Sequence, residues 1–229
     1  MKIFDNPKIP SADYKKVYAV ANEFLAASRS ITSFPFKVKN FLEEQSDIQI
    51  CSFSKARKHG VDVSSLGSES AIIIESMGAY IIFYNQDEPP CRIRFSILHE
   101  FGHYIFEHTP DLKKTDLLYR KQELEANCFA AQMLMPEQLL RECMSRGKKL
   151  STNLIIQAFG VSREAAQKKV NTLSKTNSDW RSIEEKKYDD IILQKYSSTL
   201  DQIAPKSVFY DLDWDLERQR ERDSWLSMR

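Results

Sequence analysis

Residues 94–108 read Arg-Phe-Ser-Ile-Leu-His-Glu-Phe-Gly-His-Tyr-Ile-Phe-Glu-His, and this stretch holds three of the four histidines in the chain. His99 and His103 are four residues apart, so on a helix they lie on the same face. Two imidazoles arranged in this way can bind one zinc ion at about 2.0–2.1 Å and leave a coordination position open for water. The alternative, a metal-free pair of core histidines, would leave both imidazoles unsatisfied among apolar neighbours. The stretch therefore predicts a helix that carries a metal site.

Glu100 directly follows the first of these histidines. A carboxylate at that position can take a proton from an attacking water and later deliver it to a leaving amine. We therefore expect Glu100 to be the catalytic general base. Gly102 lies inside the same predicted helix, where glycine costs about 1 kcal/mol relative to alanine, so it predicts close approach of another backbone or of substrate.

A third ligand is required, and the residues after the motif narrow its position. The metzincin pattern would place glycine at 106 and histidine at 109, where this chain has Phe106 and Thr109, and it is therefore excluded. His108 is one residue out of that register and is a weak ligand candidate. Residues 120–136 form a second predicted helix, rich in alanine, with two glutamates near its start and a proline at its end.

Glu123 shares a face of this second helix with Asn127, one turn later, whereas Glu125 points away. We expect Glu123 to be the third ligand. The alternatives are that Glu125 takes this role or that both carboxylates are merely solvated. Asn127 is expected to hold the outer N–H of a ligand histidine and so to fix its tautomer.

Residues 71–75 and 79–84 flank Met77 and Gly78 as a predicted β-hairpin. A strand with an exposed edge can pair with an extended peptide and present its scissile carbonyl to a metal. We expect the second strand to do so, with an ordinary core strand as the equal alternative; its residues are Ala79, Tyr80, Ile81, Ile82, Phe83 and Tyr84. The donor that polarises the tetrahedral oxyanion is not decided by the sequence, and Tyr119 and His108 are the candidates.

The motifs His-Glu-Phe-Gly-His-Tyr-Ile-Phe-Glu-His and Glu-Leu-Glu-Ala-Asn-Cys-Phe-Ala-Ala-Gln-Met-Leu-Met-Pro resemble the ImmA/IrrE-type metallopeptidases, a gluzincin-like group of bacterial and phage enzymes. The resemblance extends over residues 12 to 175. It implies one zinc ion per chain, held by His99, His103 and Glu123, with Glu100 as the base. It also implies endoproteolysis of a DNA-binding transcriptional repressor, in the setting of a mobile element or a stress response.

Residues 150–173 read as helix, tight turn and helix, with Ser162 as the N-cap of the second, which is the pattern of a helix-turn-helix. Segment 137–176 carries eight basic and three acidic residues, a local charge of +5. DNA contact through this segment is one reading. Docking of the repressor, which we expect to be a helix-turn-helix protein, and simple packing against the peptidase are the other two.

Composition agrees with one modest catalytic domain and additions, because the chain has 229 residues and 42% hydrophobic content. A net charge of +1 predicts no general affinity for DNA or membranes. The four cysteines show no paired spacing and the first residues lack an apolar signal core, so we expect a cytoplasmic protein. No window of eighteen apolar residues predicts a membrane span, and a membrane is not an expected partner.

We therefore predict an α+β fold in three segments. Residues 1–136 form a zincin-like peptidase domain with a small antiparallel or mixed sheet and an active-site helix; 137–176 form the helix-turn-helix-like segment; and 177–229 form a variable C-terminal extension. The extension holds Trp180, Trp214 and Trp225, and we expect it to dock on the core. The predicted activity is a zinc-dependent endopeptidase; the alternative is a non-catalytic regulator that binds a repressor, a toxin or antitoxin partner, or DNA.

Overall fold

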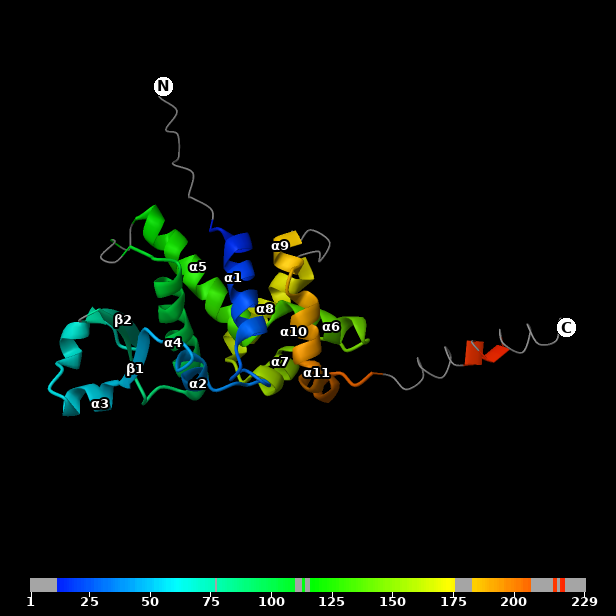
Figure 1. Cartoon of the computed structure of the whole chain (residues 1–229), viewed down its shortest axis with the longest axis horizontal. Helices are drawn as coiled ribbons and strands as arrows, with labels where there is room; N and C mark the ends of the chain where they lie inside the picture. Colours follow the sequence, from blue (N-terminus) through cyan, green and yellow to red (C-terminus); the bar gives the residue numbers. More distant parts are fainter. Residues whose placement is uncertain are drawn as a thin grey trace, which may run out of the picture.

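The computed structural model describes residues 12–76, 78–109, 113, 116–175, 183–206, 216–217 and 219–220. The fold is α+β, as the sequence predicts. A small sheet lies at one end of the molecule, the C-terminal helices lie towards the other, and three longer helices fill the centre (Figure 1). The three tryptophans lie outside the described residues.

The first half of the chain supplies the sheet and the helices around it. Its elements are α1 (Tyr14–Ala27), α2 (Val38–Leu42), β1 (Ile48–Ser52), α3 (Phe53–Lys58), the 3-10 helix η1 (Val63–Leu66), β2 (Ala71–Ser76) and β3 (Ala79–Tyr84). The second half is helical, with α4 (Pro90–Ile105), α5 (Leu117–Leu134), α6 (Glu137–Ser145), α7 (Thr152–Phe159), α8 (Arg163–Lys175), α9 (Ile183–Lys186), α10 (Asp189–Lys195) and α11 (Ser197–Ile203).

The sheet is mixed and has the strand order β1-β3-β2. β2 and β3 form the predicted antiparallel hairpin, while β1 pairs with β3 in parallel. Alternation along β3 directs its side chains into two different cores: Ile82 belongs to the main core with α4, and Phe83 belongs to a smaller core with α3. Helix α4 therefore covers one face of the sheet, and α3 with η1 covers the other.

The prediction that a substrate peptide pairs with Ala79–Tyr84 is wrong. β3 is the central strand, and it is paired with β1 over Tyr80–Tyr84 on one side and with β2 over Ala79–Tyr84 on the other. A peptide can be added only at an edge, where N–H and C=O groups lack a strand partner. The edge strand next to α4 is β2, the first strand of the predicted hairpin.

Helices α4 and α5 pack closely, and Gly102 explains how. A Cβ atom placed on Gly102 would lie 3.2 Å from the Cα of Ala126 and 3.3 Å from a ring carbon of Phe129. The sequence-based expectation of close approach by another backbone is confirmed, and that backbone belongs to α5. Small residues at this crossing bring the two ligand-bearing helices together.

The two helices that the sequence predicts on either side of Gly160 are α7 and α8. Gly160 ends α7 in a left-handed conformation with φ of 62°, and the Ser162 hydroxyl accepts the N–H of Ala165 at the start of α8. Arg94 of α4 donates to the carbonyls of Phe159 and Gly160 at 3.1 and 3.0 Å. The turn is thereby attached to α4, the helix that carries His99 and His103.

The C-terminal helices pack on α1 and α6 rather than forming a separate body. Tyr196 and Leu200 are buried in the same core as Phe101 of α4 and Leu173 of α8. All three predicted segments thus share one hydrophobic core within the described part of the chain. Docking of the extension on the core, which the sequence predicts, is confirmed for α10 and α11. In the described residues, no helix combines the length and the apolar composition that a bilayer span needs.

Candidate metal centre

Three side chains meet at the crossing of α4 and α5. The Nε2 atoms of His99 and His103 are 3.0 Å apart, and the Glu123 carboxylate lies 3.6 Å from the first and 3.4 Å from the second. A tetrahedral zinc ion with bonds of about 2.0–2.1 Å holds its ligand atoms about 3.3 Å from one another. The observed separations bracket that value, so these three side chains fit a zinc ion.

Each ligand position follows from local structure. The four-residue spacing puts both imidazoles on one side of α4, one turn apart. Glu123 stands one turn after Tyr119 on α5, and its carboxylate faces the two imidazoles of α4. The crossing at Gly102 then brings the two helices close enough for one carboxylate to reach both rings. The sequence predicts the identity of this cluster, and the structure places its members together.

The protonation of the cluster suits a metal. Burial and, to a smaller extent, the neighbouring His103 ring lower the pKa of His99 to about 4, so the imidazole is neutral near pH 7. The interaction with the His103 ring holds the pKa of Glu123 below its ordinary value. Neutral imidazoles and an ionised carboxylate are the protonation states in which these groups ligate metals.

Glu100 lies beside the cluster with a carboxyl suited to proton transfer. Burial raises its pKa to about 7, although the backbone N–H of Ile73 and the nearby His103 act in the opposite direction. That N–H donates to the carboxylate at 3.1 Å and comes from the edge strand β2. A base with a pKa near the working pH is the most effective kind, so the raised pKa of Glu100 is of the kind that suits a general base.

Tyr119 lies beside the Glu123 carboxylate. Burial and the charge of Glu123 raise the pKa of its phenol, which also interacts with the Glu123 carboxylate and feels the charge of Glu100. The residue is half-buried and lies one turn before Glu123 on α5. Its hydroxyl remains a donor near pH 7, as stabilisation of an oxyanion requires.

His108 lies on the opposite side of His103 from the cluster. Its Nδ1 is 2.9 Å from Nδ1 of His103, and its Nε2 is 3.3 Å from the carboxylate of Glu125. The His108 side chain is only 4% exposed. Of the two candidate oxyanion donors, His108 thus has both ring nitrogens engaged, one with His103 and the other with Glu125.

Asn127 lies close to His99, and the interaction raises the pKa of that ring. No hydrogen bond of ordinary length reaches Nδ1 of His99 from the described residues, however. The role predicted for Asn127 in fixing a ligand tautomer therefore stays a prediction. Cys128, the next residue, has its thiol pKa raised to about 11 by burial, which agrees with a packed thiol rather than a ligand.

A groove of about 1370 Å³ opens onto the centre. His99, Glu100 and Phe95 line it on the side of α4, and Arg163 and Lys168 line it where α8 begins. The helix-turn-helix-like segment is therefore a wall of the groove that contains the candidate base. A polypeptide lying in this groove would contact the first turns of α8.

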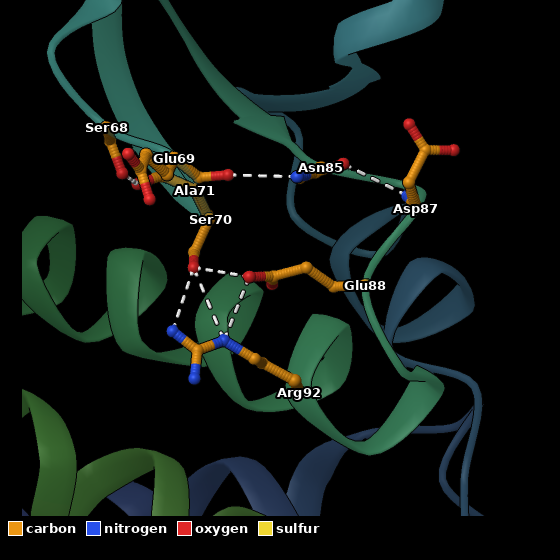
Figure 2. Close-up of polar contacts among 8 residues, drawn as sticks. All are labelled: Ser68, Glu69, Ser70, Ala71, Asn85, Asp87, Glu88 and Arg92. Carbon is orange, nitrogen blue, oxygen red and sulfur yellow. Dashed lines mark hydrogen bonds and ion pairs between the residues drawn. The ribbon is translucent and has the colours of Figure 1, made fainter.

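Side-chain contacts connect the start of β2 to the start of α4 beside the groove. Arg92, in the first turn of α4, donates to Glu88 at 2.9 Å and to the hydroxyl of Ser70 at 3.1 Å, and that hydroxyl also contacts Glu88 at 2.7 Å (Figure 2). A second hydroxyl, of Ser68, bonds the carbonyl of Ala71 at 2.5 Å. These contacts tie the edge strand to the N-terminal end of the helix that carries His99.

Sequence reasoning missed two parts of this site. Glu125 was weighed only as a ligand or as a solvated charge, yet it is buried and bonded to His108. Ile73 was placed in a strand, but nothing in its side chain signals that its backbone N–H meets Glu100. No local signal links position 125 to His108, which lies beyond the end of α4, and the contact of Ile73 depends on strand order.

Comparison with known families agrees with this geometry. Residues 43–171 match the Peptidase_M78 family, which is described as the IrrE N-terminal-like domain. The match covers more than half of the chain and includes the sheet, both ligand-bearing helices and most of α8. A search of curated proteins gives no match. On the extent of the family match, the chain belongs to the Peptidase_M78 family, the IrrE N-terminal-like metallopeptidases.

Proposed function

We propose that this protein is a zinc-dependent endopeptidase that binds one zinc ion per chain and cleaves a DNA-binding transcriptional repressor. The observation that carries the proposal is the cluster of His99, His103 and Glu123, with Glu100 beside it at the end of an open groove. Two imidazoles and one carboxylate favour zinc over harder cations, which prefer oxygen ligands. Zinc bound there would act as a Lewis acid on the substrate carbonyl and the attacking water.

The residues around the cluster have separate tasks in peptide hydrolysis. Glu100 would accept the proton of the attacking water and pass it to the nitrogen of the leaving amine. Tyr119 would donate its hydroxyl to the developing oxyanion. The edge of β2 would align the substrate backbone, and the Ile73 N–H that contacts Glu100 in the free protein would then be available to a substrate carbonyl.

Membership of the family supports a protein as the substrate, and the resemblance to ImmA/IrrE-type enzymes supports a repressor of the helix-turn-helix class. The groove extends from Glu100 to the first turns of α8, so we propose that the repressor docks against α8. DNA contact through residues 137–176 is the alternative. A direct titration with double-stranded DNA at physiological salt would test it, because contact through basic side chains is weakened by added salt.

The metal is tested by elemental analysis of purified protein after dialysis against metal-free buffer. We expect about one zinc per wild-type chain. Glu123→Ala should lose it, whereas Glu43→Ala, at an exposed site on the surface, should retain it. If zinc is absent from the wild type even after it is added back, the peptidase proposal fails and a non-catalytic regulator becomes the better description.

The substrate is tested by comparing new protein termini in cells that express wild-type protein or Glu100→Gln. We expect a cleaved repressor, and derepression of its target genes, only with the wild type. If Glu100→Gln derepresses equally well while binding the same repressor, the protein acts by binding, as a regulator on a peptidase fold.

A further inference from the structure

His103 is contacted on both ring nitrogens. Its Nε2 faces the candidate metal position, 3.0 Å from Nε2 of His99, and its Nδ1 is 2.9 Å from Nδ1 of His108. On the far side, Nε2 of His108 lies 3.3 Å from a carboxylate oxygen of Glu125. The three side chains form a line that runs from the metal position into the protein interior.

Proton counting gives this line one consistent assignment. Nε2 of His103 must offer a lone pair to a metal, so the proton of the neutral ring lies on Nδ1 and is donated to His108. Nδ1 of His108 therefore accepts, and its own proton lies on Nε2, facing the carboxylate of Glu125. The reverse assignment would place a proton on the ligand atom of His103 and a lone pair of His108 against a carboxylate.

Glu125 is itself held in place. Its second carboxylate oxygen accepts the backbone N–H of Asp13 at 2.7 Å, and the Lys121 ammonium lies 3.7 Å away. Its side chain is 10% exposed and that of His108 is 4% exposed, so water does not compete strongly for either contact. The start of α1 thus anchors the carboxylate that orients His108.

We propose that His108 and Glu125 are positioning residues that fix the tautomer and the ring orientation of His103 for metal binding. This inference rests on the proposed zinc site. Partners of this kind, in contact with a ligand histidine, typically change metal affinity by about 10- to 100-fold when they are removed. Neither residue touches the metal position, so their effect is exerted through His103 alone.

The first test is zinc affinity, measured by competition with a chromophoric chelator. His108→Phe keeps a ring of similar size but has no acceptor, and we expect its dissociation constant for zinc to rise about 10- to 100-fold. His108→Asn places an amide oxygen where Nδ1 stands and should recover much of the affinity. His59→Phe, at an exposed histidine outside α4, is the matched control and should leave the affinity unchanged.

The second test reads the tautomers directly in zinc-loaded wild-type protein by long-range proton–nitrogen NMR of the histidine rings. With only four histidines in the chain, the spectrum is simple to assign. We expect the proton of His103 on Nδ1 and that of His108 on Nε2. This measurement decides the proposal even if His108→Phe does not fold.

The outcomes separate this inference from the function on which it rests. A wild-type protein that binds no zinc removes the proposed function. A wild type that binds zinc, with His108 protonated on Nδ1 or with an unchanged affinity in folded His108→Phe, overturns the positioning role and leaves the zinc site intact.

Discussion

Buried polar groups differ in their hydrogen bonding between the metal centre and the C-terminal packing against α1. At the centre, Nδ1 of His99 has no hydrogen-bond partner among the described residues, and burial raises the pKa of Glu100 to about 7. At the end of α1, Lys195 donates to the carbonyls of Leu25 at 2.7 Å and of Ser28, and the Tyr196 hydroxyl donates to Leu25 at 2.8 Å.

The difference teaches that the packing against α1 contributes to stability, whereas the metal centre contributes to reactivity. Paired polar groups at a helix end remove unsatisfied carbonyls and stabilise the native state. Incompletely paired groups at the centre cost stability but remain free to bind a metal and to move protons. Changes at the centre should therefore alter chemistry with little loss of stability, and changes beside α1 should do the reverse.

The largest effect is expected at the centre, for Glu100→Gln. The amide keeps the size of the side chain and can still accept the Ile73 N–H, but it cannot take a proton. We expect kcat to fall by about 10²- to 10⁴-fold while bound zinc is retained. Peptide hydrolysis measured together with metal content checks this. A variant that keeps its activity would show that another group is the base.

Tyr196→Ala tests the contribution of the C-terminal packing against α1 to stability. This side chain is fully buried and bonded to α1, and its loss should lower the free energy of unfolding by about 3–5 kcal/mol, as truncation of large buried aromatics does. Chemical denaturation measures this change, and Ile183→Ala, at a site 85% exposed, is the control. Zinc affinity of the folded fraction should not change; a large loss of affinity would break the separation of the two regions.

Gly102→Ala tests whether helix spacing connects stability to the centre. The added methyl would press on the backbone of Ala126, which can move only with the whole of α5. We expect overpacking to cost about 1–3 kcal/mol, offset by about 1 kcal/mol from the better helix propensity of alanine. Zinc affinity should also fall, since displacement of α5 carries Glu123 away from the histidines. A more stable variant with unchanged affinity would contradict this spacing argument.

The pH dependence of peptide hydrolysis should follow the protonation of Glu100. The base works as a carboxylate, so lowering the pH below its pKa removes the active form, and kcat/KM should fall about tenfold per pH unit on the acidic limb. The pKa is raised to about 7 in the metal-free protein, and a bound cation would lower it, so the limb should begin below pH 7. A flat acidic limb in the zinc-loaded enzyme would assign the proton transfer elsewhere.

The smallest effect is expected at the rim of the groove, for Arg92→Ala. Because the Arg92 side chain is 63% exposed, its ion pair with Glu88 should contribute less than about 1 kcal/mol to stability. We expect a higher KM with little change in kcat, because β2 is less firmly attached beside the substrate. Lys39→Ala removes a comparable exposed i,i+4 pair far from the groove and should leave KM unchanged.

Local patterns explain why much of this protein is predictable. The apolar period of residues 14–27 forms α1, and the turn at Gly160 with the cap at Ser162 forms the helix-turn-helix. The metal cluster is predictable for the same reason: i,i+4 spacing places His99 and His103 on one face wherever that helix forms.

Long-range placement explains what the residue spacing does not show. The sequence predicts the two strands of the hairpin, β2 and β3. It does not predict that β1 pairs with the other side of β3, and this pairing makes β2 the edge strand of the sheet next to α4. His108 looks like a donor near the motif, yet helix α4 ends at Ile105 and the following turn directs the ring behind His103. The spacing of neighbouring residues predicts neither of these two placements.

The sequence by itself determined the residues of the candidate metal centre, the candidate base and the helices that carry them, because short-range geometry in a helix depends only on residue spacing. Tertiary structure alone decided which strand borders the groove, that α8 forms one of its walls, and that His108 and Glu125 support His103 from behind. These relations join atoms that are far apart along the chain, and only packing of the whole core brings them together.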